Sequence, residues 1–404
     1  MELARSIPPY VTAVLATLQK RGKRGYLVGG SLRDLLRGEV PHDFDLTTDA
    51  TPDEMLEILG DFRVIPTGLS HGTVTVLSDG HPIEITTHRT DGTYSDSRHP
   101  DSVCFTTELC EDLARRDFTV NAMAFSPETG LQDPFGGQAD LKKRVLRAVG
   151  EPKKRFEEDA LRILRCFRFV AKLGFSVEAN TARAARDCAA RLSLIAVERI
   201  FSELTRTVTA PKAAEGLAAL FEAGCTPYVF FDVKPDEALL TRLAALPPDA
   251  PLRIAALLHK SDEGQVRHLI RRWHAPNAFL DSVLSYLSIL KEPLPATPYE
   301  ARRFVCRHYP YFEKGLILRG VLYFEDVDAA LALTKQVLKN GTAIEIRRLA
   351  VNGKELQDAV GVRPDKTAFL LGRLQDLVWQ APQKNRREIL LLEARRIVKE
   401  EHLL

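Results

Sequence analysis

The chain changes character near residue 145, and this change limits the folds that its 404 residues can adopt. Segments with the apolar alternation of half-buried strands occur in the first part. They are Tyr26–Val28, Phe44–Thr47, Val74–Leu77, Ile83–Thr87 and Phe118–Phe125. From about residue 146 onward, apolar residues recur at helical spacing, first over Arg155–Leu173, which Gly174 is expected to end. We therefore expect an α+β fold, in which a small mixed β-sheet is followed by an all-helical remainder.

A glycine pair, Gly29-Gly30, follows the first strand-like segment and opens a helical pattern. Ser31 is the expected N-cap of this helix and Gly38 its expected stop. Backbone N–H groups of such a turn can approach phosphate oxygens closely, and the helix dipole favours their negative charge. Arg33 lies in the first helical turn, where its guanidinium can reach the same phosphates. The segment therefore predicts a triphosphate-binding turn.

Two aspartates, Asp43 and Asp45, stand in the next strand-like segment. Because side chains alternate along a strand, both carboxylates are expected on one face, with Phe44 and Leu46 in the core on the other. Neighbouring carboxylates repel each other unless a cation lies between them. An isolated pair of this kind is also typical of a polar strand edge. After a glycine turn suited to phosphate, it indicates a metal-dependent phosphoryl-transfer site.

The motifs GGSLRDLLRG, HDFDLTTDATP, RRDFTVNAMAF, DPFGGQADL and RFEEDALRILRCFRF occur in this order between about residues 26 and 205. Together they resemble the bacterial class II CCA-adding enzymes (tRNA nucleotidyltransferases), and LAVNGKEL at 349–356 is a weaker match. The resemblance implies template-independent addition of C, C and A to the tRNA 3′ end from CTP and ATP, with release of pyrophosphate. It implies a nucleotidyltransferase head over 1–145, a base-selecting neck over 146–205, a helical body over 206–290 and a tRNA-binding tail over 291–404.

The expected catalytic residues are three carboxylates. Asp43 and Asp45 would hold Mg²⁺, with two ions about 3.5–4 Å apart between the attacking oxygen and the leaving pyrophosphate. Glu84 alternates with Ile83 and Ile85 in a predicted strand. If that strand lies beside the aspartate strand, Glu84 can join the cluster and support activation of the attacking hydroxyl. The alternative for Glu84 is an ordinary exposed strand position.

The triphosphate needs several cations, and the arginine fork matches phosphate oxygens. By resemblance Arg116, in the run RRDFTVNA, contacts the nucleotide together with Gly30 and Arg33. We expect Arg115 to be solvated or to pair with nearby acids, and Asp117 to hold Arg116 in place. Outside this context, such a run is an ordinary charged turn.

Base selection is expected on the helix that carries Asp159 and Arg162, which are three positions apart and would share a face. Asp159 accepts and Arg162 donates, which matches the amino donor and ring-nitrogen acceptor of cytosine and adenine. Guanine and uracil present the reverse pattern, and each buried polar group left unpaired costs about 1–3 kcal/mol. By resemblance, Arg165 and Arg168 complete the nucleotide site. The alternative is a helix stabilised by surface salt bridges.

Composition adds few restrictions. Net charge is +2, from 56 Lys and Arg against 54 Asp and Glu, so contacts to a tRNA acceptor arm and 3′ end would come from local patches. The six cysteines lack zinc spacing, and no apolar run reaches membrane-spanning length, which favours a cytoplasmic protein without a membrane partner. The loop His88–Asp101 is a candidate lid for the change from C to A addition.

Three other functions remain open: a poly(A) polymerase, which shares the head; a partial enzyme that adds only C-C or only A; and a catalytically inactive RNA-binding protein. The oligomeric state is also open, and a homodimer is compatible with the sequence.

Overall fold

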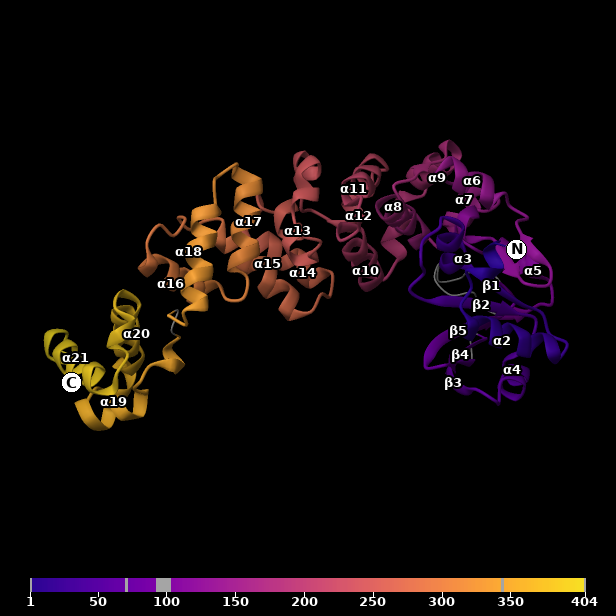
Figure 1. Cartoon of the computed structure of the whole chain (residues 1–404). Helices are drawn as coiled ribbons and strands as arrows, with labels where there is room; N and C mark the ends of the chain where they lie inside the picture. The colour runs from indigo at the N-terminus through magenta and orange to yellow at the C-terminus, as the bar shows by residue number, and fades with distance from the viewer. Residues whose placement is uncertain (1, 70–71, 92–102, 343–344, 403–404) are drawn as a thin grey trace. The chain divides into compact units, whose positions relative to one another are not determined.

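The computed structural model describes residues 2–69, 72–91, 103–342 and 345–402 (Figure 1). The chain forms two compact units. The first comprises residues 1–234 and 272–274, and the second comprises 235–271 and 275–404. The finer division into head, neck, body and tail stays a prediction.

The predicted mixed sheet is confirmed. In the described part of the chain, seven strands form it in the order β3-β4-β5-β2-β1-β8-β9, with β2 and β5 parallel and the other neighbours antiparallel. The strands are β1 (Gly25–Val28), β2 (Phe44–Thr48), β3 (Arg63–Gly68), β4 (Thr73–Ser78), β5 (His81–Thr87), β8 (Ala124–Ser126) and β9 (Gly130–Gln132). Two smaller pairs are β6 (Arg89–Asp91) with β7 (Val103–Phe105), and β10 (Val145–Leu146) with β11 (Ser176–Val177).

One predicted strand is wrong in most of its length. Within Phe118–Phe125, residues Thr119–Asn121 form a 3₁₀ turn and β8 begins only at Ala124. The reason lies in the preceding Asp117, whose Oδ1 accepts hydrogen bonds from the Phe118 N–H and from Asn121 Nδ2. Such local side-chain bonding competes with the hydrogen bonds of a sheet.

The two faces of the sheet differ in character. One is apolar, because Phe44, Leu46 and the alternate residues of β4 and β5 are buried against α2 (Pro9–Lys20) and α4 (Pro52–Ile58). Directly paired residues of neighbouring strands lie on the same face, so Asp45 and Glu84 share the other one. The helix α5 (Leu109–Ala114) places the buried Leu113 in a small cluster with Tyr26 and Val28 on β1.

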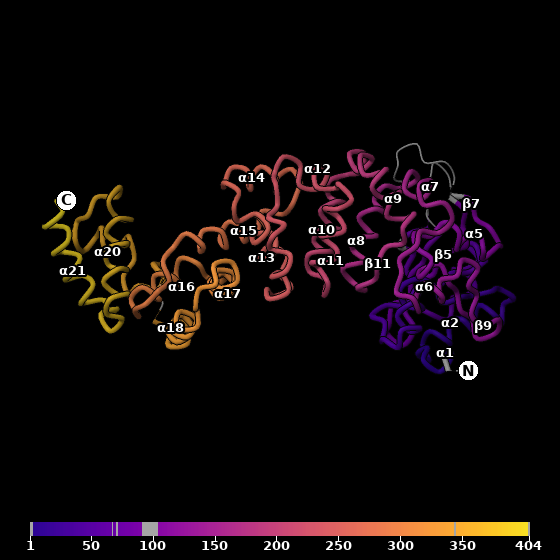
Figure 2. The backbone as a smooth tube through the Cα atoms, turned by 90° about the horizontal axis from the view of Figure 1, so that it is seen from above, coloured from indigo at the N-terminus to yellow at the C-terminus, as the bar shows by residue number. Residues whose placement is uncertain are grey.

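Three of the helices after the sheet, α7, α10 and α11, pack against α8, and α9 packs against α7; Figure 2 shows α10 and α11 beside α8. They are α7 (Pro152–Glu158), α8 (Leu161–Leu173), α9 (Ala179–Asp187), α10 (Val197–Val208) and α11 (Ala213–Glu222). Gly174 ends α8 in the left-handed conformation (φ 65°), as predicted. The predicted continuous helix over Arg155–Leu173 is wrong, because Asp159 is extended (φ −143°, ψ 102°) and separates α7 from α8.

In its described residues the second unit consists of helices and the segments that connect them, without a strand. Its α-helices are α13 (Ala250–Leu257), α14 (Glu263–Arg272), α15 (Asn277–Ile289), α16 (Pro298–His308), α17 (Phe312–Tyr323), α18 (Asp328–Lys339), α19 (Gly353–Val360), α20 (Thr367–Gln380) and α21 (Arg387–Glu400). Thr297 and Glu300 form a capping box that starts α16. Across the described residues, no helix combines the length and the apolar character needed to cross a membrane.

Candidate active site

Two of the three predicted carboxylates face each other across neighbouring strands. In the parallel pair β2–β5, Asp45 lies opposite Glu84. The strand adjacency on which the prediction for Glu84 depended is therefore confirmed. Asp43 was expected to be a strand residue, but β2 begins only at Phe44. Asp43 directly precedes the strand and is exposed. Asp45 is partly buried and Glu84 is exposed.

The electrostatics of Asp45 show that its surroundings are short of positive charge. Burial raises the pKa of the Asp45 carboxyl, and the negative charges of Asp43 and Glu84 raise it further, to about 6. The nearby Arg116 lowers it only in part. A bound cation would relieve this repulsion. Oxygen donors of this kind suit Mg²⁺, which is often bound by one or two carboxylates together with substrate phosphates and water.

The donors present are few. In the described ranges, no group of three or more His, Cys, Asp and Glu side chains is close enough to hold a metal ion. The residues therefore fit an ion that is completed by phosphate oxygens and water, rather than an ion enclosed by protein ligands.

The glycine turn lies directly against these carboxylates. Gly29 has φ +71°, and a Cβ there would lie 3.3 Å from Arg116 Nη1 and 3.8 Å from Asp45 Oδ2. The backbone conformation therefore favours glycine, and a larger residue would also crowd Arg116 Nη1. The expected N-cap role of Ser31 is wrong, because α3 (Gly29–Leu36) already begins at Gly29. The Ser31 hydroxyl donates to Val28 O at 3.0 Å and accepts from the Asp45 N–H at 3.5 Å, which joins the turn to β2.

Arg33 lies in a buried polar network rather than at the surface. Its side chain is 2% exposed. Arg33 Nε donates to Asp34 Oδ1 at 2.8 Å, and Nη1 donates to Asn121 Oδ1 at 2.7 Å. The guanidinium also lies 5.4 Å from the centroid of the Phe169 ring. These contacts fix the orientation of Arg33 next to Gly30, where a Cβ would lie 3.6 Å from Arg33 Nη2.

Asp112 holds both arginines of the RRDFTVNA run. It accepts hydrogen bonds from Arg115 Nε and Nη2 at 2.9 and 2.7 Å, and from Arg116 Nη2 at 3.1 Å. Burial alone would raise the pKa of Asp112, but the two guanidinium groups bring it down to about 2. The pairing expected for Arg115 is confirmed. Arg116 Nε is buried and, among the described residues, has no hydrogen-bond partner, but the Arg116 side chain as a whole is 19% exposed, so its guanidinium can still reach a phosphate oxygen.

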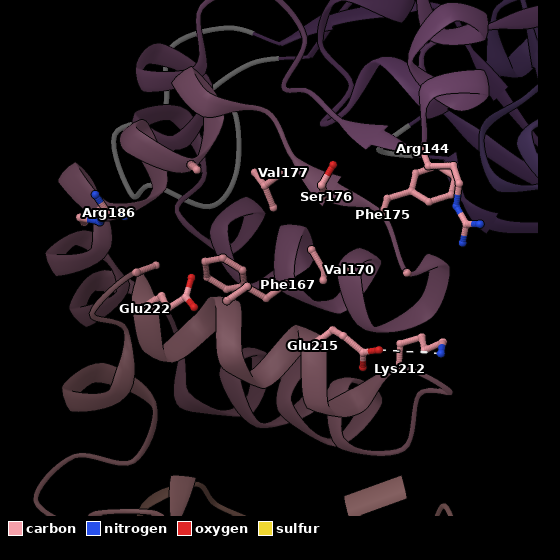
Figure 3. Close-up of a pocket in the computed structure, with 14 residues that line it drawn as sticks. Arg144, Phe167, Val170, Phe175, Ser176, Val177, Arg186, Lys212, Glu215 and Glu222 are labelled. Atoms are coloured by element: carbon pink, nitrogen blue, oxygen red, sulfur yellow. Dashed lines mark ion pairs between the residues drawn. The ribbon is translucent and has the colours of Figure 1, made fainter. Parts of the chain in front are cut away.

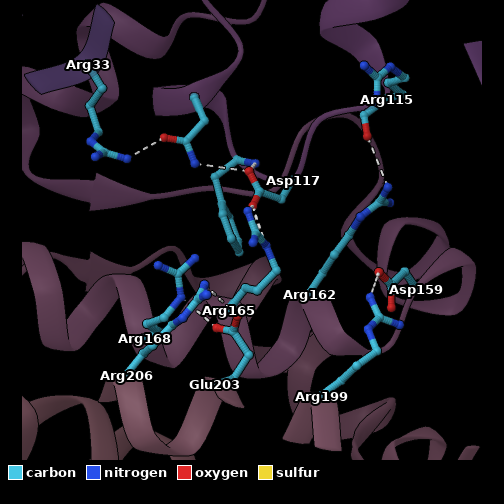
Figure 4. A network of polar contacts seen from close by, with 12 residues as sticks. Arg33, Arg115, Asp117, Asp159, Arg162, Arg165, Arg168, Arg199, Glu203 and Arg206 are labelled. Atoms are coloured by element: carbon cyan, nitrogen blue, oxygen red, sulfur yellow. Dashed lines mark hydrogen bonds and ion pairs between the residues drawn. The ribbon is translucent and has the colours of Figure 1, made fainter. Parts of the chain in front are cut away.

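The expectation that Asp117 holds Arg116 is wrong. Asp117 Oδ2 instead accepts from Arg165 Nε at 2.9 Å and Nη2 at 2.6 Å (Figure 4). Its Oδ1 accepts from Asn121, which in turn accepts from Arg33. Burial opposes ionisation of Asp117, yet Arg165 and Asn121 lower its pKa to about 2. Asp117 and Asn121 therefore link the glycine-turn helix α3 to α8.

The predicted pairing of Asp159 and Arg162 on one helix face is also wrong, because Asp159 lies in the break between α7 and α8. Asp159 Oδ1 accepts from the Leu161 N–H at 3.0 Å, and Oδ2 accepts from Arg199 Nη2 at 3.1 Å. Arg162 donates to the Arg115 carbonyl at 3.0 Å and to Glu158 and the Arg155 carbonyl within its own segment. Asp159 thus lies in extended backbone between two helices, whereas Arg162 lies within α8. The role of both residues in base selection stays a prediction.

Arg168 is anchored by α10. Arg168 Nε donates to Glu203 Oε2 at 2.6 Å, and its guanidinium lies 4.4 Å from the Phe169 ring centroid. Figure 4 shows Arg165, Arg168 and Glu203 close together, and Asp159 with Arg199 as a separate pair.

Several residues of this network were not singled out by sequence reasoning. The signal for Asp112 was present, because it lies on α5, three and four positions before the two arginines that directly follow this helix. Arg199 and Glu203 gave no such signal, since their partners are 40 and 35 positions away.

Comparison with known proteins identifies the family. Residues 25–147 match the family described as Poly A polymerase head domain, and residues 174–236 match one described as a probable RNA- and SrmB-binding site of polymerase A. The CCA-adding enzyme of Geobacillus thermodenitrificans is 38% identical over 371 residues, which cover 88% of each chain. The chain belongs to the CCA-adding enzyme family.

One further CCA-adding enzyme and two solved structures are also similar to this chain. The CCA-adding enzyme of Enterococcus faecalis is 32% identical over 95% of this chain and 94% of its own. The crystal structure of the Bacillus stearothermophilus CCA-adding enzyme in complex with CTP superposes with a TM-score of 0.82 at 30% identity, over 98% of this chain and all of that one. The Thermotoga maritima CCA-adding enzyme complexed with tRNA shares the fold at a TM-score of 0.67 and 19% identity.

Proposed function

We propose that the chain is a template-independent nucleotidyltransferase that adds C, C and A to the 3′ end of tRNA, using CTP and ATP and releasing pyrophosphate. Family membership supports the reaction class. The observation that supports this site most directly is the convergence of Asp45, Gly29 and Arg116, because it places a carboxylate, a glycine turn and a partly exposed guanidinium group next to one another. Phosphoryl transfer needs little covalent chemistry from the protein beyond such positioning and charge stabilisation.

In this proposal Asp43 and Asp45 bind Mg²⁺, which would stabilise the negative charge that develops on the attacking and leaving oxygens. Glu84, opposite Asp45, favours loss of the proton from the tRNA 3′ hydroxyl. The in-line attack of that hydroxyl on the α-phosphate breaks the bond to the β-phosphate and releases pyrophosphate. The N–H groups of the turn at Gly30, together with Arg33 and Arg116, bind the β- and γ-phosphates.

Base selection is assigned to Asp159, Arg162, Arg165 and Arg168. Arg199 leaves the Asp159 carboxylate able to accept from an exocyclic amino group, because a carboxylate has about four acceptor positions. Arg165 is ionised and fixed by Asp117, so it provides a donor of defined direction. Guanine and uracil would place a carbonyl acceptor opposite the Asp159 carboxylate and an N–H donor opposite an arginine, and would leave these groups without hydrogen bonds.

The test uses purified protein with Mg²⁺ and three tRNA transcripts, which end before the CCA, after the first C and after both. Each transcript receives CTP, ATP, both, or GTP with UTP, and products are resolved to single nucleotides. Growth to a single CCA stop supports the proposal. A stop after C-C, or A added only to the C-C end, means a partial enzyme. A ladder of A on arbitrary RNA means a poly(A) polymerase, and no extension means an RNA-binding protein.

A further inference from the structure

A cavity of about 540 Å³ lies against α8 (Figure 3). Its walls come from the second half of α8, from β11, and from α9 and α11. Phe167 and Val170 line it, whereas Arg165 faces Asp117. At about 100° per residue, these two apolar residues point away from Arg165 on the helix. The cavity is therefore on the opposite face of α8 from the arginine network proposed to bind nucleotides.

The floor of this cavity is apolar. Phe167, Val170 and Phe175 are buried and contribute to it, and the wall on the side of α11 includes Ala219 and, just after the helix, Ala223. Small side chains on that wall leave the space open. The volume is within the range of about 300–1,000 Å³ that is typical of small-molecule sites, in which a mainly apolar lining carries a few polar groups.

One end of the cavity carries two cations. Gly174 ends α8 there, and a Cβ on it would lie 3.7 Å from Arg144 Nη2 and 3.5 Å from Lys212 Cγ. Among the described residues Arg144 has no carboxylate within ion-pair distance, and its guanidinium lies 5.9 Å from the Phe175 ring centroid. Lys212 is 3.8 Å from Glu215, but both side chains are more than half exposed, so the pair is weak.

The opposite end carries Arg186 and Glu222, as Figure 3 shows. These two side chains bear opposite charges, so this end gives little preference for either sign. The charge that remains uncompensated is thus at the end formed by Arg144 and Lys212, next to the aromatic Phe175.

We propose that this cavity binds a small organic anion. Its apolar body packs on Phe167 and Val170, and its carboxylate, sulfonate or phosphate group binds between Arg144 and Lys212. The site is separate from the nucleotide site and does not depend on which nucleotides the enzyme adds.

The test titrates the full-length protein with anilinonaphthalene sulfonate, an aromatic anion whose fluorescence rises in apolar surroundings. Binding to one saturable site is expected. Ala219→Leu, which fills the cavity, should weaken binding about tenfold or more, and Arg144→Gln should weaken it about fivefold. Lys143→Gln is the matched control, because Lys143 is an exposed cation next to Arg144 that does not line the cavity. It should change the affinity by less than about twofold.

Near-ultraviolet circular dichroism and thermal unfolding establish that each variant is folded. If Ala219→Leu is not, Ala182→Leu fills the cavity from α9 and replaces it. The proposal is overturned if no saturable binding occurs, if the filling variant or Arg144→Gln binds as the unmodified protein does, or if saturating CTP displaces the probe. Undiminished probe binding with CTP present supports a separate site, whatever the extension assay shows.

Discussion

Replacement of Asp117 by Asn should destabilise the first unit, because this carboxylate joins three parts of it. Asp117 accepts two hydrogen bonds from Arg165 on α8, one from Asn121 and one from the Phe118 N–H. An Asn side chain keeps the size and one acceptor but removes the charge. Arg165, whose side chain is 33% exposed, then loses its ion-pair partner.

The size of the effect follows from the pKa of Asp117. Its ordinary value is 3.8, and despite burial Arg165 and Asn121 lower it to about 2. The difference corresponds to roughly 2–3 kcal/mol of unfolding free energy at neutral pH. In a unit of this size we expect Asp117→Asn to lower Tm by roughly 4–10 °C. Asp61→Asn, at an exposed position, is the control and should leave Tm nearly unchanged.

The pH dependence gives this prediction its sign. A depressed folded-state pKa means that the stabilisation is complete above about pH 4 and is lost as pH falls towards about 2. Calorimetric unfolding of the unmodified protein and of Asp117→Asn, from pH 7 to about pH 2.5, should therefore show a difference in unfolding free energy that becomes smaller as the pH falls. A gap under about 1 kcal/mol at neutral pH, or one that stays constant in acid, would refute the role assigned to the carboxylate.

Three further predictions concern close contacts. Gly29→Ala should raise KM for CTP about tenfold or more in steady-state extension, because the added Cβ meets Arg116 Nη1 at 3.3 Å in a backbone conformation that disfavours it; an unchanged KM would contradict the tight turn. Gly216→Ala should lower the unfolding free energy by roughly 1–3 kcal/mol in denaturant titration, since the added Cβ would lie 2.5 Å from a side chain of α8. Unchanged stability would show that α11 can move away from α8 without an energetic cost. Asp112→Asn frees Arg116 and should weaken CTP binding in calorimetric titration by about tenfold, whereas equal binding would show that Arg116 needs no anchor.

The parts of the site that the sequence predicted are those set by local periodicity. Alternation in Ile83–Thr87 placed Glu84 on one face of a strand, and β5 does lie beside β2. Gly174 was the predicted end of the helix over Arg155–Leu173, and it does end α8, in the left-handed conformation that glycine adopts readily. For Arg115 the sequence predicted either solvation or pairing with nearby acids, and Asp112, three positions earlier, is the acid that it binds.

The contacts that the sequence did not predict are those made over long separations. Asp117 is next to Arg116 in the chain, yet it binds Arg165, 48 positions later, because neighbours in a turn point in different directions. The break at Asp159 interrupts an apolar pattern that continues across it. It is stabilised by the cap on the Leu161 N–H and by Arg199, 40 positions away, neither of which periodicity can reveal.

The most direct test of the central claim is single-turnover transfer of one C from CTP to a tRNA transcript that lacks the CCA, in Mg²⁺, by the Asp43→Asn variant. The rate is expected to fall by about a thousandfold or more, while CTP affinity and Tm change little, because Asp43 is exposed and contributes to chemistry rather than to folding. Asp61→Asn should react at the normal rate. Transfer by Asp43→Asn within about threefold of the unmodified protein would contradict the assignment of this carboxylate pair as the catalytic centre.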